Sequence, residues 1–73
     1  MSETQRYTSF GSLTDRMLYI VDMLAEGHTA AEIARDMRLA QPTVVNVITH
    51  TIRRLQLHNR KELISEYIEW VEA

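Results

Sequence analysis

Residues 29–55 read TAAEIARDMRLAQPTVVNVITHTIRRL, and this stretch decides the fold. It opens on Thr29-Ala30-Ala31-Glu32, a capping box in which a hydroxyl and a carboxylate three residues later satisfy free N–H groups at a helix start. Apolar residues then recur at helical spacing, at Ala30, Ile33, Ala34 and Met37. The pattern predicts a short helix over residues 30–37.

A longer apolar series begins only a few residues later. It comprises Val44, Val47, Ile48, Thr51, Ile52 and Leu55. Pro42 is tolerated in a first helical turn, and a residue before proline is disfavoured in helical geometry, so Gln41 is the expected boundary of a helix over residues 42–56. Two helices joined by so short a connection form a helix-turn-helix, in which the second helix presents its outer face.

Two further helices flank this unit. Met17, Ile20, Val21 and Leu24 predict a helix over residues 14–26, with Gly27 as its stop. Asn59 and Glu62 cap another over residues 60–72, whose apolar positions are Leu63, Ile64, Tyr67, Ile68 and Val71. No segment alternates with period two, so we predict an all-α, four-helix domain over residues 13–73. Residues 1–12 are predicted to be a flexible N-terminal arm, although Tyr7 and Phe10 could dock on the helices.

Composition excludes several classes of protein. The chain has 73 residues and no cysteine, and the spacing of its three histidines (His28, His50 and His58) matches no zinc site, so we expect no metal and no cofactor. No nucleophile elbow or phosphate-binding loop is present, and so short a chain cannot easily enclose a pocket, which argues against an enzyme or a small-molecule ligand. Neither a signal peptide nor an apolar run of about 18 residues is present, so we expect a cytoplasmic protein without membrane contact. The initial Met1 favours a whole protein over an excised domain.

Charge is segregated along the chain. The net charge is −2, yet residues 28–61 carry six basic residues against Glu32 and Asp36. Acidic residues dominate both ends, and residues 62–73 hold four glutamates and no base. A basic middle segment is the distribution that a nucleic-acid surface needs.

Residues 13–63 resemble a LuxR/GerE-type DNA-binding domain and align with it without a gap. The matching residues are Leu13-Thr14, Arg16, Glu26-Gly27, Thr29, Glu32-Ile33-Ala34, Thr43-Val44, Asn46, Ile48, Leu55, Asn59-Arg60 and Glu62-Leu63. This resemblance implies a four-helix domain whose third helix enters the major groove of double-stranded DNA and whose fourth helix contributes to dimerisation.

Helical geometry and the resemblance together predict which residues contact DNA and which form the dimer interface. If Val44, Ile48, Thr51 and Leu55 point inward, Val45, Asn46 and Thr49 point outward, and we expect these three to contact bases. Phosphate contacts are expected from Thr43, Arg53, Arg54, Arg60 and Lys61. The broad apolar face of the fourth helix is expected to form a homodimer interface, made by Ile64, Tyr67, Ile68, Trp70 and Val71.

The sequence departs from the family at several positions, and this keeps a second function open. The family commonly has a lysine where Val45 stands, a histidine where Val47 stands and a glutamate where Met17 stands. The favoured function is a DNA-binding transcriptional regulator, a homodimer that reads the major groove with the helix Gln41–Leu55. The alternative is a protein-interaction module that binds a larger LuxR-type regulator or another protein, with weak or no DNA binding.

Overall fold

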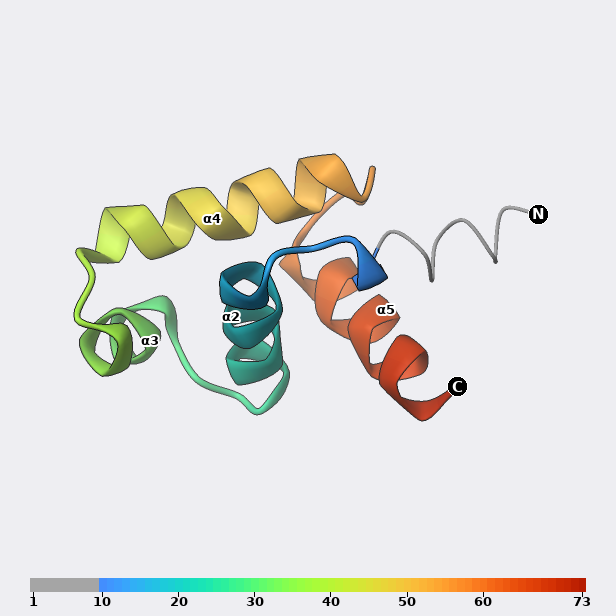
Figure 1. Cartoon of the computed structure of the whole chain (residues 1–73), viewed down its shortest axis with the longest axis horizontal. Coiled ribbons are helices and arrows are strands. Elements are labelled where there is room, and N and C mark those ends of the chain that lie inside the picture. Colours follow the sequence, from blue (N-terminus) through green and yellow to red (C-terminus); the bar gives the residue numbers. More distant parts are fainter. Residues whose placement is uncertain (1–9) are drawn as a thin grey trace.

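The computed structural model describes residues 10–73; residues 1–9, with Tyr7 and most of the predicted arm, lie outside the described part. Four α-helices follow one another: α2 (Asp15–Ala25), α3 (Ala30–Met37), α4 (Gln41–Arg54) and α5 (Arg60–Glu72). The described residues contain no strand, which confirms the predicted all-α, four-helix fold. In Figure 1, α4 runs along the top of the molecule, and α3, α2 and α5 lie below it from left to right.

The helix starts follow from local capping. The Thr29 hydroxyl accepts a hydrogen bond from the Glu32 backbone N–H at 3.1 Å, and the Glu32 carboxylate accepts one from the Thr29 N–H at 2.9 Å. That N–H lowers the pKa of Glu32. The predicted capping box of α3 is therefore confirmed. At the start of α2 only half of a box exists, because Met17 replaces the carboxylate, yet the Thr14 hydroxyl still accepts from the Met17 N–H at 3.1 Å.

The bounds of two helices differ from the sequence prediction. α2 is one residue shorter at each end, with Thr14 and Glu26 as caps. α4 begins at Gln41, because Ala40 is the extended N-cap and Pro42 occupies a first-turn position whose N–H has no helical partner anyway. α4 ends at Arg54 because Gln56 adopts a left-handed backbone with φ of 59°.

Left-handed residues stop the first three helices in the same way. Gly27, Arg38 and Gln56 have positive φ, and in each case the next residue donates its N–H to a carbonyl five positions back. These bonds are His28 N to Met23 O at 3.1 Å, Leu39 N to Ala34 O at 2.8 Å and Leu57 N to Ile52 O at 2.9 Å. This is the Schellman arrangement. Only Gly27 is the residue type that adopts it without strain.

The core is built around α2, which packs against α3, α4 and α5. Ile20 and Val21 of α2 are fully buried, as are Ile33 of α3, Val44 of α4 and Leu63 of α5. Because each neighbouring helix gives α2 one apolar stripe, the three are held in fixed positions around it.

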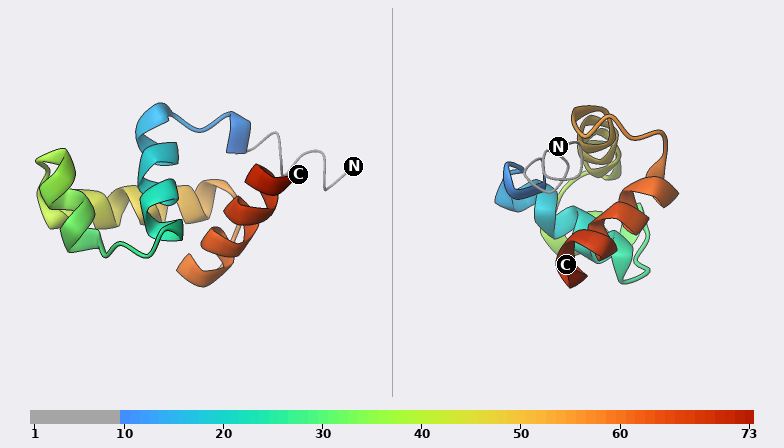
Figure 2. Two further views of the ribbon diagram at one scale, coloured as in Figure 1. Left: turned by 90° about the horizontal axis from the view of Figure 1, so that it is seen from below. Right: turned by 90° about the vertical axis from the view of Figure 1, so that its right-hand side faces the viewer.

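Phe10 belongs to this core and not to a flexible arm. Its side chain is only 1% exposed, and its ring stacks on Trp70 with centroids 5.5 Å apart and contacts Tyr67 at 5.9 Å. Leu13 is also buried. Figures 1 and 2 show the chain at residue 10 lying beside α5. The predicted boundary after residue 12 is therefore wrong for residues 10–12, because the aromatic face of α5 gives Phe10 an apolar place to dock.

Two tyrosines join α2 to its neighbours. The Tyr67 hydroxyl of α5 donates to the Asp22 carboxylate of α2 at 2.9 Å. Burial and this acceptor raise the pKa of Tyr67 to about 12. The exposed Tyr19 hydroxyl of α2 donates to the Asp36 carboxylate of α3, which raises the pKa of Tyr19.

The Phe10→Ala substitution should lower the free energy of unfolding by about 3 kcal/mol, since it removes a buried ring and leaves a cavity. Val71→Ala is the control, because Val71 is 58% exposed, and should cost under about 0.5 kcal/mol. Urea unfolding followed by circular dichroism measures both, with Phe10→Leu as a milder variant. Equal effects of Phe10→Ala and Val71→Ala would show that residue 10 is not part of the core.

Substitutions at Gly27 and Gln56 should have opposite signs. Gly27→Ala should destabilise by about 1 kcal/mol through backbone strain alone, because a Cβ at Gly27, where φ is 99°, meets no atom within 4 Å. Gln56→Gly should stabilise by about 0.5 kcal/mol, since relief of the left-handed strain exceeds the extra entropy of an unfolded glycine. Thermal unfolding of the two variants beside the wild type tests this, and a gain for Gly27→Ala would contradict it.

The Tyr67 hydrogen bond should make stability depend on alkaline pH. A pKa raised from 10.0 to about 12 means that the fold favours the neutral phenol, so its contribution is complete below pH 10 and is lost as pH rises toward 12. We expect Tyr67→Phe to cost about 1 kcal/mol at pH 8 and to remove this part of the alkaline loss. Urea titrations between pH 8 and 11.5 measure it. Tyr19→Phe should keep the Tyr67 contribution, and an unchanged alkaline loss in Tyr67→Phe would refute the assignment.

Candidate nucleic-acid interface

The connection between α3 and α4 consists of Arg38, Leu39 and Ala40. Arg38 is left-handed, with φ of 58° and ψ of 43°, and ends α3. Leu39 is half-buried against the core, and its N–H donates to the Ala34 carbonyl. The turn is therefore fixed at both its backbone and its side chain, which sets the position of α4 relative to α3.

α4 has one covered side and one open side. Val44, Ile48 and Thr51 are buried, and the Thr51 hydroxyl donates to the Val47 carbonyl at 2.7 Å, so no polar group is left unpaired there. The other helices lie on this covered side (Figure 1). An uncovered helix face preceded by a bracing helix is the arrangement that places a recognition helix in a DNA groove.

The three residues predicted to contact bases lie on or beside the open side. Asn46 and Thr49 are exposed, whereas Val45 is half-buried. Val47 is also half-buried and packs against the core, in agreement with its expected place at the core edge. The base-contact roles stay predictions, and the accessible groups among them are an amide, a hydroxyl and part of an apolar side chain.

The five predicted phosphate contacts divide between two helices. Thr43, half-buried, and the exposed Arg53 and Arg54 belong to α4. One guanidinium nitrogen of Arg54 donates to the Ser12 carbonyl at 3.3 Å, which orients this side chain and ties the end of α4 to the chain just after Phe10. A guanidinium has five N–H donors, so the others stay accessible to a phosphate.

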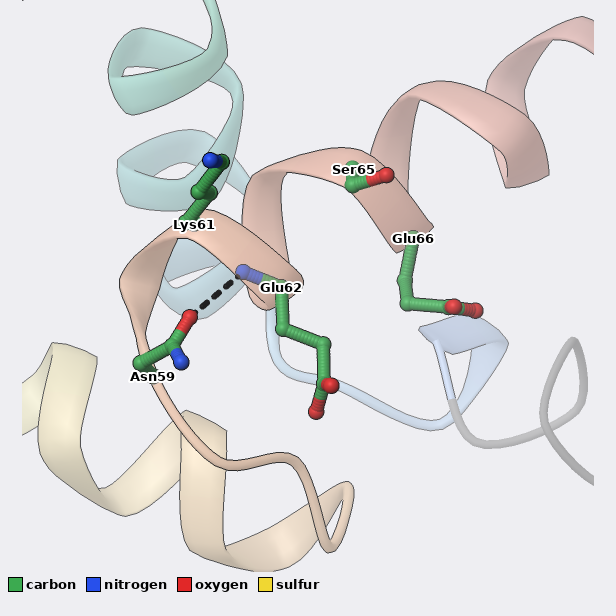
Figure 3. A pocket seen from close by; sticks show the side chains of 5 residues that line it. All are labelled: Asn59, Lys61, Glu62, Ser65 and Glu66. Carbon is green, nitrogen blue, oxygen red and sulfur yellow. Dashed lines mark hydrogen bonds between the residues drawn. The ribbon is translucent and has the colours of Figure 1, made fainter.

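Arg60 and Lys61 are exposed on the first turn of α5. Figure 3 shows the Lys61 side chain pointing away from the carboxylates of Glu62 and Glu66. The Asn59 side chain caps this turn by accepting from the Glu62 N–H at 2.8 Å, as the sequence predicts.

His50 is an exposed residue on the open side that the sequence-based list of DNA contacts leaves out. It lies one turn after Asn46 and one turn before Arg54. The spacing of four residues from Asn46 is the signal that could have identified it, because residues four apart share a helix face.

The predicted dimer face of α5 is only partly available. Tyr67 and Trp70 are half-buried under Phe10, and Ile64 is half-buried against the core. Ile68 and Val71 are 40% and 58% exposed. Packing within one molecule therefore covers much of the apolar face that is predicted to form the dimer interface, because Phe10 belongs to the core and contacts this face.

A surface pocket on α5 is lined by Asn59, Lys61, Glu62, Ser65 and Glu66 (Figure 3). All five side chains are polar, whereas ligand pockets are lined mostly by apolar groups with a few polar ones. Within residues 10–73 no cluster of three His, Cys, Asp or Glu side chains is placed to hold a metal ion. None of the four described helices combines the length and apolar content that a membrane crossing requires.

Comparison with known proteins identifies relatives of this chain. Residues 11–67 match the model of the GerE family, "Bacterial regulatory proteins, luxR family". The chain is 32% identical over 59 residues to the transcriptional regulatory protein DesR of Bacillus subtilis (strain 168), which covers 81% of this chain and 30% of DesR. It is 34% identical over 61 residues to the uncharacterized response regulatory protein YgeK of Escherichia coli (strain K12), which covers 84% of this chain and 42% of YgeK.

The chain thus spans less than half the length of these two relatives. No solved structure shows a significant match to it. The family match covers most of the described helices, including α3, the turn and α4, and the resemblance read from residues 13–63 is confirmed. The chain belongs to the luxR family of bacterial regulatory proteins.

Proposed function

We propose that this chain is a DNA-binding transcriptional regulator that acts as a homodimer and reads the major groove with α4. The observation that carries the proposal is the open side of α4, on which Asn46, Thr49 and Arg53 are exposed while Val44, Ile48 and Thr51 anchor the opposite side in the core. DesR is named a transcriptional regulatory protein, which supports the same role here. Such a role places the chain in the cytoplasm, beside the chromosome.

The proposed readout divides between bases and phosphates. Asn46 is suited to the adenine edge, Val45 to a thymine methyl group, and Thr49 to either kind of base polar group. Thr43, Arg53, Arg54, Arg60 and Lys61 would contact phosphates, which supply affinity and orientation. No Asp or Glu occurs between residues 39 and 61, so no carboxylate on α4 repels the DNA backbone.

The homodimer would form through the exposed part of α5. Ile68 and Val71 are its accessible apolar residues, with the edges of Ile64, Tyr67 and Trp70 beside them. A two-fold dimer presents two α4 helices to half-sites about one DNA turn apart, roughly 34 Å. This geometry requires a two-fold symmetric operator.

The alternative function is a protein-interaction module that pairs with a larger LuxR-type regulator or another protein. The exposed apolar residues of α5 and the half-buried Val45, where the family commonly has lysine, favour it. In this alternative α5 would bind a regulator in place of a second copy, and DNA affinity would be weak or absent.

Selection from a pool of random-sequence duplexes at low and physiological salt tests the two functions. We expect a two-fold symmetric motif to be enriched, with affinity that falls as salt rises. Retention of no duplex even at low salt would refute DNA binding and leave the protein-interaction alternative.

Arg53→Ala supplies the residue-level control on the selected duplex. It should reduce the slope of log affinity against log salt by about 1.8, because the dimer loses one phosphate contact in each copy and each contact contributes about 0.9. Arg53→Lys keeps the charge and should keep the slope. An unchanged slope in Arg53→Ala would exclude Arg53 from the interface.

A further inference from the structure

The three histidines differ in their carboxylate neighbours. His28 lies 3.9 Å from a Glu26 oxygen and 3.5 Å from a Glu32 oxygen, and His58 lies 3.1 Å from a Glu62 oxygen. Each of these two rings therefore has a carboxylate beside it within the protein. His50 makes no such pair with any residue of the described part, 10–73, although it is exposed.

His50 also lies on the proposed DNA surface. Thr43, His50 and Arg54 are seven and four residues apart, which places them along one edge of α4 at close to whole turns. His50 thus stands between two predicted phosphate contacts, about 6 Å along the helix axis from Arg54. The two edges of a helix in the major groove face the phosphate backbones, and His50 occupies an unassigned position on such an edge.

The charges around His50 are basic on its own helix. Arg53 and Arg54 follow it by three and four residues, and α4 carries no acid. Charged residues also occur on the three helices packed on α4. They are Asp15, Arg16 and Asp22 on α2, Glu32, Arg35 and Asp36 on α3, and Arg60, Lys61, Glu62, Glu66, Glu69 and Glu72 on α5. None of these carboxylates lies within 4.0 Å of His50, so no ion pair within residues 10–73 competes with an external anion for a charge on this ring.

We propose that His50, when protonated, binds a DNA phosphate and makes the DNA affinity of this chain depend on pH. The proposal rests on the DNA-binding function above and adds a residue and a regulating variable to it. Imidazolium has two N–H donors and a positive charge, whereas neutral imidazole has one donor and no charge. A phosphate beside the ring favours the protonated form, so DNA binding would take up one proton for each copy in the dimer.

Salt titrations of the selected duplex at pH 5.5 and pH 8 test the proposal with the full chain. The wild type should bind up to about tenfold more tightly at pH 5.5. Its slope of log affinity against log salt should be steeper there by about 1.8, since each copy in the dimer neutralises one more phosphate. His50→Gln should behave at both pH values like the wild type at pH 8, and His50→Arg should keep the steeper slope at both.

Matched controls are available in the other two histidines. His28→Gln and His58→Gln should retain the pH dependence of the wild type, because these rings are paired with carboxylates. Circular dichroism confirms that each variant is folded. A His50→Gln protein with the wild-type pH dependence would overturn the inference and leave the proposed function intact. Absence of DNA binding at both pH values would overturn both.

Discussion

The hydrogen bond from the Leu39 N–H to the Ala34 carbonyl, 2.8 Å long, fixes how the chain turns from α3 into α4. It requires a left-handed residue at Arg38, a conformation that costs a non-glycine residue about 1 kcal/mol. Burial of Leu39 against the core offsets this cost. Because the connection has only three residues, a different backbone conformation at Arg38 would change the direction of α4 relative to α3. The position of the open side of α4 thus depends on one strained residue.

A domain of 73 residues can bury only a small apolar core, and Phe10 enlarges that core. Its ring contacts both Tyr67 and Trp70, which also contact each other, so the first described residue of the chain completes the packing of the last helix. The Arg54 bond to the Ser12 carbonyl extends the same segment to the end of α4. Residues 10–12 therefore join the helix proposed to read DNA to the helix proposed to dimerise.

Sequence patterns predicted the helices and their starts well, but did not predict the end of α4 or the contacts of Phe10. The helix starts at Thr29 and Asn59 were predictable because a cap is a local interaction between residues three apart. The early end of α4 was not, because nothing in its composition marks Gln56 as left-handed. Phe10 was placed in an arm because a lone aromatic has no periodicity, and its partners lie about 60 residues further along the chain. The dimer face predicted on α5 includes Tyr67 and Trp70, the two residues that Phe10 contacts, and its role stays a prediction.

Local charge, and not the net charge of −2, governs what the open side of α4 attracts. At physiological ionic strength, charges are screened over about 8 Å, so glutamates on distant surfaces act weakly on a phosphate at α4. Several carboxylates are moreover engaged within the protein: Asp22 accepts from Tyr67, Asp36 from Tyr19, and Glu32 from Thr29. On α4 itself no acid offsets Arg53 and Arg54. An acidic protein can therefore present a basic edge, and His50 lies on that edge without an ion pair to any residue between 10 and 73.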